Sequence, residues 1–157
     1  MIEKELLTKV RHIALATVNE DGTPHNTPLF FAFDKQFKRL FFVSRDESLH
    51  TKNFMRDGRA FAALYDSNEF NGGLYLTIEN GRKLEGVELT DAHEIYTARC
   101  NAFDIDVLPE NFHISNDGYN LYAGDILKIE KYGAEEDSEG RLKSEKRVFI
   151  SVEELLS

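Results

Sequence analysis

Residues 13–33 read IALATVNEDGTPHNTPLFFAF, and this stretch decides the fold. Ile13 to Val18 is apolar and partly β-branched, which predicts a strand. Asn19-Glu-Asp-Gly22 is typical of a hairpin turn, with glycine where the backbone needs a positive φ. His25 to Phe33 predicts the return strand. The stretch therefore predicts a β-hairpin.

The sequence on either side of this hairpin predicts further elements. The apolar spacing of Glu3 to Val10 predicts an opening helix that packs on the sheet. After a turn at Asp34 to Lys38, the run Arg39 to Ser44 predicts a third strand, which suits burial on both faces. Three consecutive strands then form a meander.

A helix is predicted directly after the third strand. Ser44-Arg-Asp-Glu47 has the form of a capping box, and the helix is expected to end near Asp57-Gly58. Its buried stripe is predicted to be Leu49, Phe54 and Met55. A helix thus interrupts the series of strands.

The rest of the chain continues in short strands around one further helix. That helix is expected from a cap at Asp91-Ala-His-Glu94 to about Phe103, and residues 134–147 are expected to form an exposed loop or hairpin tip. The predicted strands are Ala60 to Tyr65, Leu74 to Ile78 turning at Asn80-Gly81 into Lys83 to Leu89, Leu121 to Tyr132 after a turn at residues 116–118, and Val148 to Ile150. This pattern predicts an α+β fold, mainly antiparallel β, closed as a barrel within one domain over residues 1–157.

Charge and composition exclude several functions. The formal net charge of −9 disfavours nucleic acid and anionic membranes as partners. The first ten residues have no sustained apolar run, so neither a signal peptide nor a membrane anchor is expected, and the cytoplasm is the predicted location. Residues 35–59 carry seven basic and three acidic side chains, a net +4. A basic stretch of this kind is either a solvent-exposed face or a binding site for a small anion.

Other reactive residues suggest structural roles. Cys100, the single cysteine, excludes an intrachain disulfide and is expected to be a buried thiol; no spacing predicts a metal site. His25 could face a ligand or bond to backbone or water. Asp104 and Asp106 are more typical of a solvated loop than of acid–base catalysts, and His12, His93 and His113 lack a partner at diagnostic spacing.

The order of these segments resembles the pyridoxamine 5'-phosphate oxidase family of flavoproteins. The likeness runs from about Val10 to Tyr65, and more loosely to the strand at Leu121. It is carried by Ile13-Ala-Leu-Ala-Thr-Val18, Asp21-Gly22-Thr-Pro24-His25, Thr27-Pro28-Leu29-Phe30, Phe41-Phe-Val-Ser44, Ser48-Leu-His50-Thr-Lys52-Asn53-Phe54 and Arg59-Ala60. The resemblance implies an FMN-binding split barrel that works as a homodimer, with the cofactor at the subunit interface.

The resemblance also implies where FMN would lie. The isoalloxazine ring would lie against segments matching Thr27, Pro28 and Leu29 and Phe42, Val43 and Ser44, and the phosphate site would match Ser48, Leu49, His50 and Lys52. The local sequence supports this phosphate site, because a helix that starts directly after a strand directs its free N–H groups and the positive end of its dipole at one place. His50 departs from the pattern, since many relatives have Lys or Arg there.

The function expected from this likeness is an FMN-dependent oxidoreductase acting on an unknown small molecule. No catalytic residue is named, because a bound flavin carries the redox chemistry. The end of the chain, Arg147 to Ser157, does not match the substrate-binding segment of the true oxidase. The alternatives are a non-catalytic flavin, deazaflavin or haem binding protein, working as a carrier or sensor, and a barrel that has become an interaction module.

Overall fold

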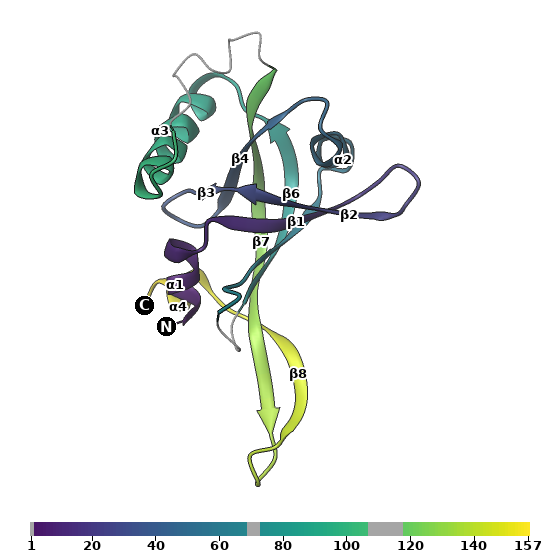
Figure 1. Cartoon of the computed structure of the whole chain (residues 1–157), viewed down its shortest axis with the longest axis vertical. Coiled ribbons are helices and arrows are strands. Elements are labelled where there is room, and N and C mark those ends of the chain that lie inside the picture. Colours follow the sequence, from purple (N-terminus) through teal and green to yellow (C-terminus); the bar gives the residue numbers. More distant parts are fainter. Residues whose placement is uncertain (1, 69–72, 107–117) are drawn as a thin grey trace.

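The computed structural model of the chain describes residues 2–68, 73–106 and 118–157 (Figure 1). Its helices are α1 (Ile2–Lys9), α2 (Leu49–Asp57), α3 (Gly86–Ala102) and α4 (Val152–Leu156). Its strands are β1 (His12–Val18), β2 (Pro24–Phe30), β3 (Ala32–Phe33), β4 (Arg39–Arg45), β5 (Ala60–Leu64), β6 (Leu74–Lys83), β7 (Tyr119–Glu136) and β8 (Leu142–Phe149).

All of these strands belong to one antiparallel sheet that curls into a barrel. The strand order is β2-β1-β5-β6-β7-β4-β3, and β8 pairs with β7 outside this path. The two ends of the order, β2 and β3, are separated in sequence by Phe31 alone. One bent stretch of chain therefore joins both edges of the sheet, which confirms the predicted α+β split barrel.

The opening hairpin forms as predicted. Its register pairs Val18 with Pro24 and His12 with Phe30. Gly22 has a φ of +83°, and the Asp21 carboxylate accepts a hydrogen bond from the N–H of Thr23 at 3.0 Å. The return strand is shorter than expected, because the chain bends at Phe31 and begins β3.

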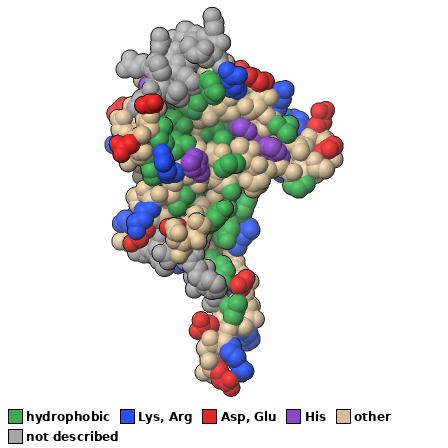
Figure 2. All heavy atoms as spheres, in the orientation of Figure 1, with side chains coloured by type: hydrophobic (Ala, Val, Ile, Leu, Met, Phe, Trp, Pro, Cys, Tyr) green, Lys and Arg blue, Asp and Glu red, His purple; other side chains and the backbone are tan. Residues whose placement is uncertain are grey.

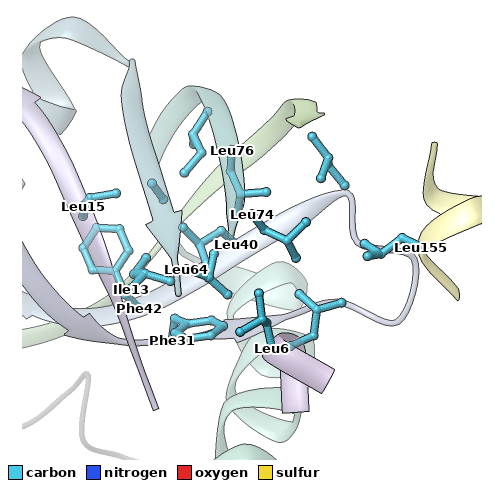
Figure 3. Packing of buried hydrophobic residues seen from close by; sticks show 14 of the residues in the cluster. Leu6, Ile13, Leu15, Phe31, Leu40, Phe42, Leu64, Leu74, Leu76 and Leu155 are labelled. Atoms are coloured by element: carbon cyan, nitrogen blue, oxygen red, sulfur yellow. The ribbon is translucent and has the colours of Figure 1, made fainter. Parts of the chain in front are cut away.

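Two apolar clusters lie on opposite sides of the sheet. The larger fills the barrel with side chains from the strands, together with Leu6 of α1 and Leu155 of α4 (Figure 3). The smaller lies beneath α3 and includes Phe41, Tyr96 and Cys100. Adjacent residues of a strand point to opposite faces, so Phe42 enters the barrel while Phe41 contacts the α3 cluster.

The helix α2 differs from its prediction at its start. Its N-cap is Ser48, and Ser44 belongs to β4, where it pairs with Asn120. Leu49 and Met55 are exposed, and the side chains that α2 buries are Thr51, Asn53 and Phe54. The predicted capping box is wrong, and of the predicted apolar stripe Phe54 is buried while Leu49 and Met55 are not, because hydrogen bonds of Thr51 and Asn53, together with the Phe54 ring, hold this face of the helix.

The turn predicted at Asn80-Gly81 and the strand after it are also wrong. β6 continues through this point to Lys83, with a register irregularity, and α3 already begins at Gly86 instead of Asp91. Gly81 is required for packing, since a Cβ there would lie 2.8 Å from the Phe54 ring. A packing requirement thus explains the glycine that resembled a turn signal.

The C-terminal strands are longer than predicted. The segment expected as a loop or hairpin tip is the end of β7 and most of β8, which project from the barrel as a two-stranded arm (Figure 1). Every residue of β8 is exposed. The predicted turn at Asn116 and Asp117, like His113, lies outside the described residues. Within the described residues, no helix is long and apolar enough to cross a membrane.

Candidate functional site

The start of α2 is the centre of the candidate site. The N–H of Lys52 donates the first helical hydrogen bond, to the Ser48 carbonyl at 3.0 Å. Ser48 makes no side-chain cap bond, and the first turn carries no acidic residue. The N–H groups of Leu49, His50 and Thr51 therefore remain available, together with the positive end of the helix dipole, for an anion.

A buried hydroxyl chain lies beside this helix start. The Thr51 hydroxyl donates to Ser44 Oγ at 2.8 Å, and Ser44 Oγ lies 2.8 Å from His50 Nε2. Since Ser44 already accepts from Thr51, its own proton can be given to Nε2. In that arrangement Nδ1 carries the proton of a neutral imidazole and is the donor that His50 can offer a ligand.

Burial favours the neutral form of His50. Desolvation lowers the pKa of His50, and the charge of nearby His25 lowers it further. His25 lies on β2, where its Nε2 is 2.9 Å from the Thr27 hydroxyl. On the face shown in Figure 2, histidine side chains lie next to one another close to the hairpin. The structure therefore brings the start of α2 and the middle of β2 to one surface.

The predicted ring-binding residues divide between faces. Thr27 and Leu29 are half-buried on one face of β2, and Pro28 points to the other, where it lines a separate pocket of about 420 Å³. The Phe42 ring is fully buried in the barrel, 6.2 Å from the His50 ring. Val43 packs against the α3 cluster.

The predicted phosphate-site residues lie closer together. Ser48, Leu49 and His50 form the cap and first turn of α2, with Ser44 bonded to His50. Lys52 is exposed two positions after His50, which places it about 200° around the helix axis. The structure thus groups Ser48, Leu49 and His50 with Thr27, and it leaves the side chains of Lys52, Pro28 and Val43 on other faces.

Sequence reasoning missed the residues that fix α2 in place. Asn53 is buried, and its side-chain amide donates to the Thr17 hydroxyl at 3.2 Å and to Asn19 Oδ1 at 2.8 Å. Arg56 donates to the Asn53 side-chain oxygen and to the Val18 carbonyl. No spacing signal could have found this network, because Asn53 is 34 residues from Asn19.

The other reactive residues do not join the site. Cys100 is buried, and burial raises the pKa of its thiol, which keeps it protonated and unreactive. Asp104 and Asp106 are exposed in the segment that follows α3. In the described part of the chain, no group of three or more His, Cys, Asp or Glu side chains could hold a metal ion.

Comparisons with known proteins agree with this fold. An F420 reductase structure is 17% identical, with a TM-score of 0.59 over 80% of this chain and 94% of that one. The haem storage protein HutZ from Vibrio cholerae is 14% identical, with a TM-score of 0.63 over 80% and 89% of the two chains. A Clostridium acetobutylicum protein related to general stress protein 26, of the pyridoxinephosphate oxidase family, is 14% identical, with a TM-score of 0.63 over 98% and 94%.

At these identities the structural likenesses establish the fold alone. No curated protein sequence matches significantly. The family model described as pyridoxamine 5'-phosphate oxidase matches residues 3–121, which is most of the 157-residue chain and includes the barrel strands β1 to β6 and the helix α2. The chain belongs to the pyridoxamine 5'-phosphate oxidase family.

Proposed function

We propose that this protein binds FMN and works as an FMN-dependent oxidoreductase on a small molecule. The observation that carries the proposal is the uncapped start of α2, next to the Ser44–His50–Thr51 chain and facing the same surface as β2. A phosphate ester suits this place, because free N–H groups and a positive dipole favour an anion. Family membership supports the same cofactor.

Each residue of the site would have a defined task. The N–H groups of Leu49 and His50, the Ser48 hydroxyl and the Nδ1–H of His50 would hold the phosphate. Thr27 and Leu29 would contact the isoalloxazine ring, with Thr27 oriented by its hydrogen bond to His25. Bound FMN would supply the redox chemistry, while the chain binds, orients and shields it.

A homodimer completes the proposal. The face of β2 that carries Thr27 and Leu29 is only half-buried, with Leu29 packed against the barrel core, so a ring lying beside Thr27 would keep one side open to solvent. A second copy of the chain would cover that side and leave an opening for the substrate. This arrangement places the cofactor between two subunits.

The first test is a titration of the purified protein with FMN and, separately, with riboflavin, followed by flavin fluorescence and absorbance. We expect saturable binding of FMN. His50→Ala should weaken FMN binding more than riboflavin binding, because riboflavin lacks the phosphate; Lys52→Ala, which removes only a nearby positive charge, should do so to a smaller extent. Lys143→Ala, on the exposed arm, is the matched control. Equal losses for both ligands would contradict the phosphate assignment.

The second test separates an enzyme from a carrier. The FMN-loaded protein is mixed with NADH or NADPH under anaerobic conditions, and bleaching of the flavin absorbance is followed. Reduction followed by reoxidation by an added acceptor supports an oxidoreductase. If the protein binds stoichiometric flavin that neither NADH nor NADPH reduces, the result favours a non-catalytic carrier or sensor. Repeating the binding titration with a deazaflavin distinguishes that cofactor from FMN.

Haem is a second candidate, supported by one specific observation. His25 and His50 are both half-buried and close enough for the charge of one to lower the pKa of the other. A neutral imidazole at this surface could serve as an axial ligand. A Soret band that forms on adding hemin, and shifts in His25→Ala or His50→Ala, would favour haem over FMN.

A further inference from the structure

A second site is formed by a groove of about 710 Å³ between the β3–β4 turn, β7 and the C-terminal segment. Residues 35–38, 126–129, 149–153 and Leu156 line it. None of the residues proposed to hold FMN lies in these segments. Its volume is in the range of pockets that take small molecules, roughly 300–1,000 Å³.

The groove is walled by apolar side chains that the fold leaves uncovered. Leu127 and Phe149 are each 62% exposed, and Leu156 is 39% exposed. Beneath them Ile129 and Ile150 are buried in the barrel core. An exposed surface of this kind, gathered in one concave place, is typical of a site for an apolar ligand.

The charged side chains of the groove are mainly positive. Its lining contains three basic side chains, those of Lys35, Lys38 and Lys128, and one acidic side chain, that of Glu153. This is the reverse of the whole chain, whose net charge is −9. Lys128 forms an ion pair with Glu130 at 2.8 Å. Lys35 and Lys38 form no ion pair with any side chain in the described ranges. Lys38 is therefore available to a ligand in this groove, while Lys35 lies between the groove and a smaller pocket that contains Asp91 and Glu94.

The turn that carries these two lysines is held in place by hydrogen bonds. The buried Asp34 carboxylate accepts from the N–H of Lys38 at 2.8 Å and is paired with Arg39 at 3.1 Å. The Lys38 carbonyl accepts from the N–H of Ile126 at 2.8 Å. Because Arg39 neutralises Asp34, this carboxylate does not compete with a ligand for the lysines.

Phe37 fixes the same turn from the other side. It has a φ of 51°, in the left-handed region, and its N–H donates to the Asp34 carbonyl at 3.1 Å. Its ring lies 5.4 Å from the Phe33 ring, against the barrel core. The turn therefore presents Lys35 and Lys38 from a fixed backbone, which lowers the entropy cost of binding.

From these observations we infer that the groove binds a single-chain amphiphile with an anionic head, such as a straight-chain carboxylate. The chain lies along Leu127, Phe149 and Leu156, and the head lies at Lys35 and Lys38. A second copy of this protein suits the groove less well. In a two-fold interface the same patch meets itself, which would bring two net positive surfaces together.

The test is isothermal titration of the full-length protein with dodecanoate below its micelle-forming concentration. Dodecyltrimethylammonium and acetate are titrated as controls, because the first has the chain with the opposite charge and the second has the head without the chain. We expect saturable binding of dodecanoate at one site. Equal binding of the ammonium compound, or no binding of dodecanoate, would overturn the inference.

Two variants locate the ligand. Phe149→Ser should weaken dodecanoate binding about tenfold through lost apolar contact, with Leu142→Ser on the arm as its control. The double substitution Lys35→Gln and Lys38→Gln should weaken it about fivefold, with Lys143→Gln as its control. Because FMN is proposed to bind elsewhere, FMN titration curves should stay unchanged, so failure of either proposal is recognised separately. A change of oligomeric state in Phe149→Ser would overturn the inference in favour of a second copy.

Discussion

In the described part of the chain two helices begin at a serine, and the two serines behave differently. Ser151, at the start of α4, accepts a hydrogen bond from the N–H of Glu154 at 3.1 Å, and the first turn contains Glu153 and Glu154. Ser48, at the start of α2, has similar extended backbone angles but makes no such bond, and no acidic residue follows it. Of these two helices, only α4 satisfies its positive end from its own sequence.

The comparison shows that a good capping residue does not guarantee a cap. Around α2 the nearby carboxylates have other partners. Asp46 accepts from the Tyr122 hydroxyl and pairs with Lys83, and Glu47 pairs with Arg45. The pKa of Asp46 is lowered, first by the Tyr122 hydrogen bond, so this carboxylate stays charged and engaged. The start of α2 therefore remains open, as an anion site requires.

The largest effect is expected from Asn53→Ala, which removes the anchor of α2. The buried Thr17 hydroxyl and the Asn19 side chain would each lose a partner. We expect the free energy of unfolding to fall by about 2 kcal/mol, measured by chemical denaturation. Asn68→Ala, in an exposed loop, is the control. A loss no greater than the control's would show that α2 is held by apolar contact instead.

Leu49→Glu would make the start of α2 resemble that of α4. Leu49 is 48% exposed, so the substitution should leave the barrel intact. A carboxylate in the first turn should repel the FMN phosphate and weaken FMN binding about tenfold, while Leu49→Gln should have a much smaller effect. The measurement is flavin fluorescence at low salt. If Leu49→Glu and Leu49→Gln weaken FMN binding equally, the phosphate does not bind at the start of this helix.

The serines themselves can be exchanged for alanine. Ser151→Ala should lower the free energy of unfolding by about 1 kcal/mol, because a helix N–H loses its partner. Ser48→Ala should change stability less, since its side chain makes no cap bond. Denaturant titration of both variants checks this order. A larger loss of unfolding free energy in Ser48→Ala than in Ser151→Ala would contradict the difference described between the two helix starts.

The smallest effect is expected from the protonation of His50. The fold lowers the pKa of His50 below its ordinary 6.5, so its contribution to stability is present above that pH and is lost as pH falls through the lowered pKa. The melting temperature of the FMN-free protein should therefore decline less steeply on acidification in His50→Gln. FMN affinity should move the other way and rise in acid, because the phosphate favours the protonated ring.

Much of the fold could be predicted from residues 13–45, because alternation, turn chemistry and the hairpin are local properties of the chain. The helix end at Asp57-Gly58 was also predictable, and Gly58 has the positive φ that such a C-cap needs. The Asn80-Gly81 signal misled, since Gly81 is there to make room for the Phe54 ring. Local patterns cannot distinguish a turn glycine from one that permits close packing.

The sequence by itself determined the opening hairpin, the third strand, the position of the inserted helix and the likeness to one family, since each depends on neighbouring residues. Only the tertiary structure decided which side chains meet at the candidate site. The Ser44–His50–Thr51 chain, the approach of His25 and the anchoring by Asn53 depend on β4, β2, β1 and α2 being brought together. Contacts between segments distant in sequence follow from the closure of the barrel, and no local pattern encodes them.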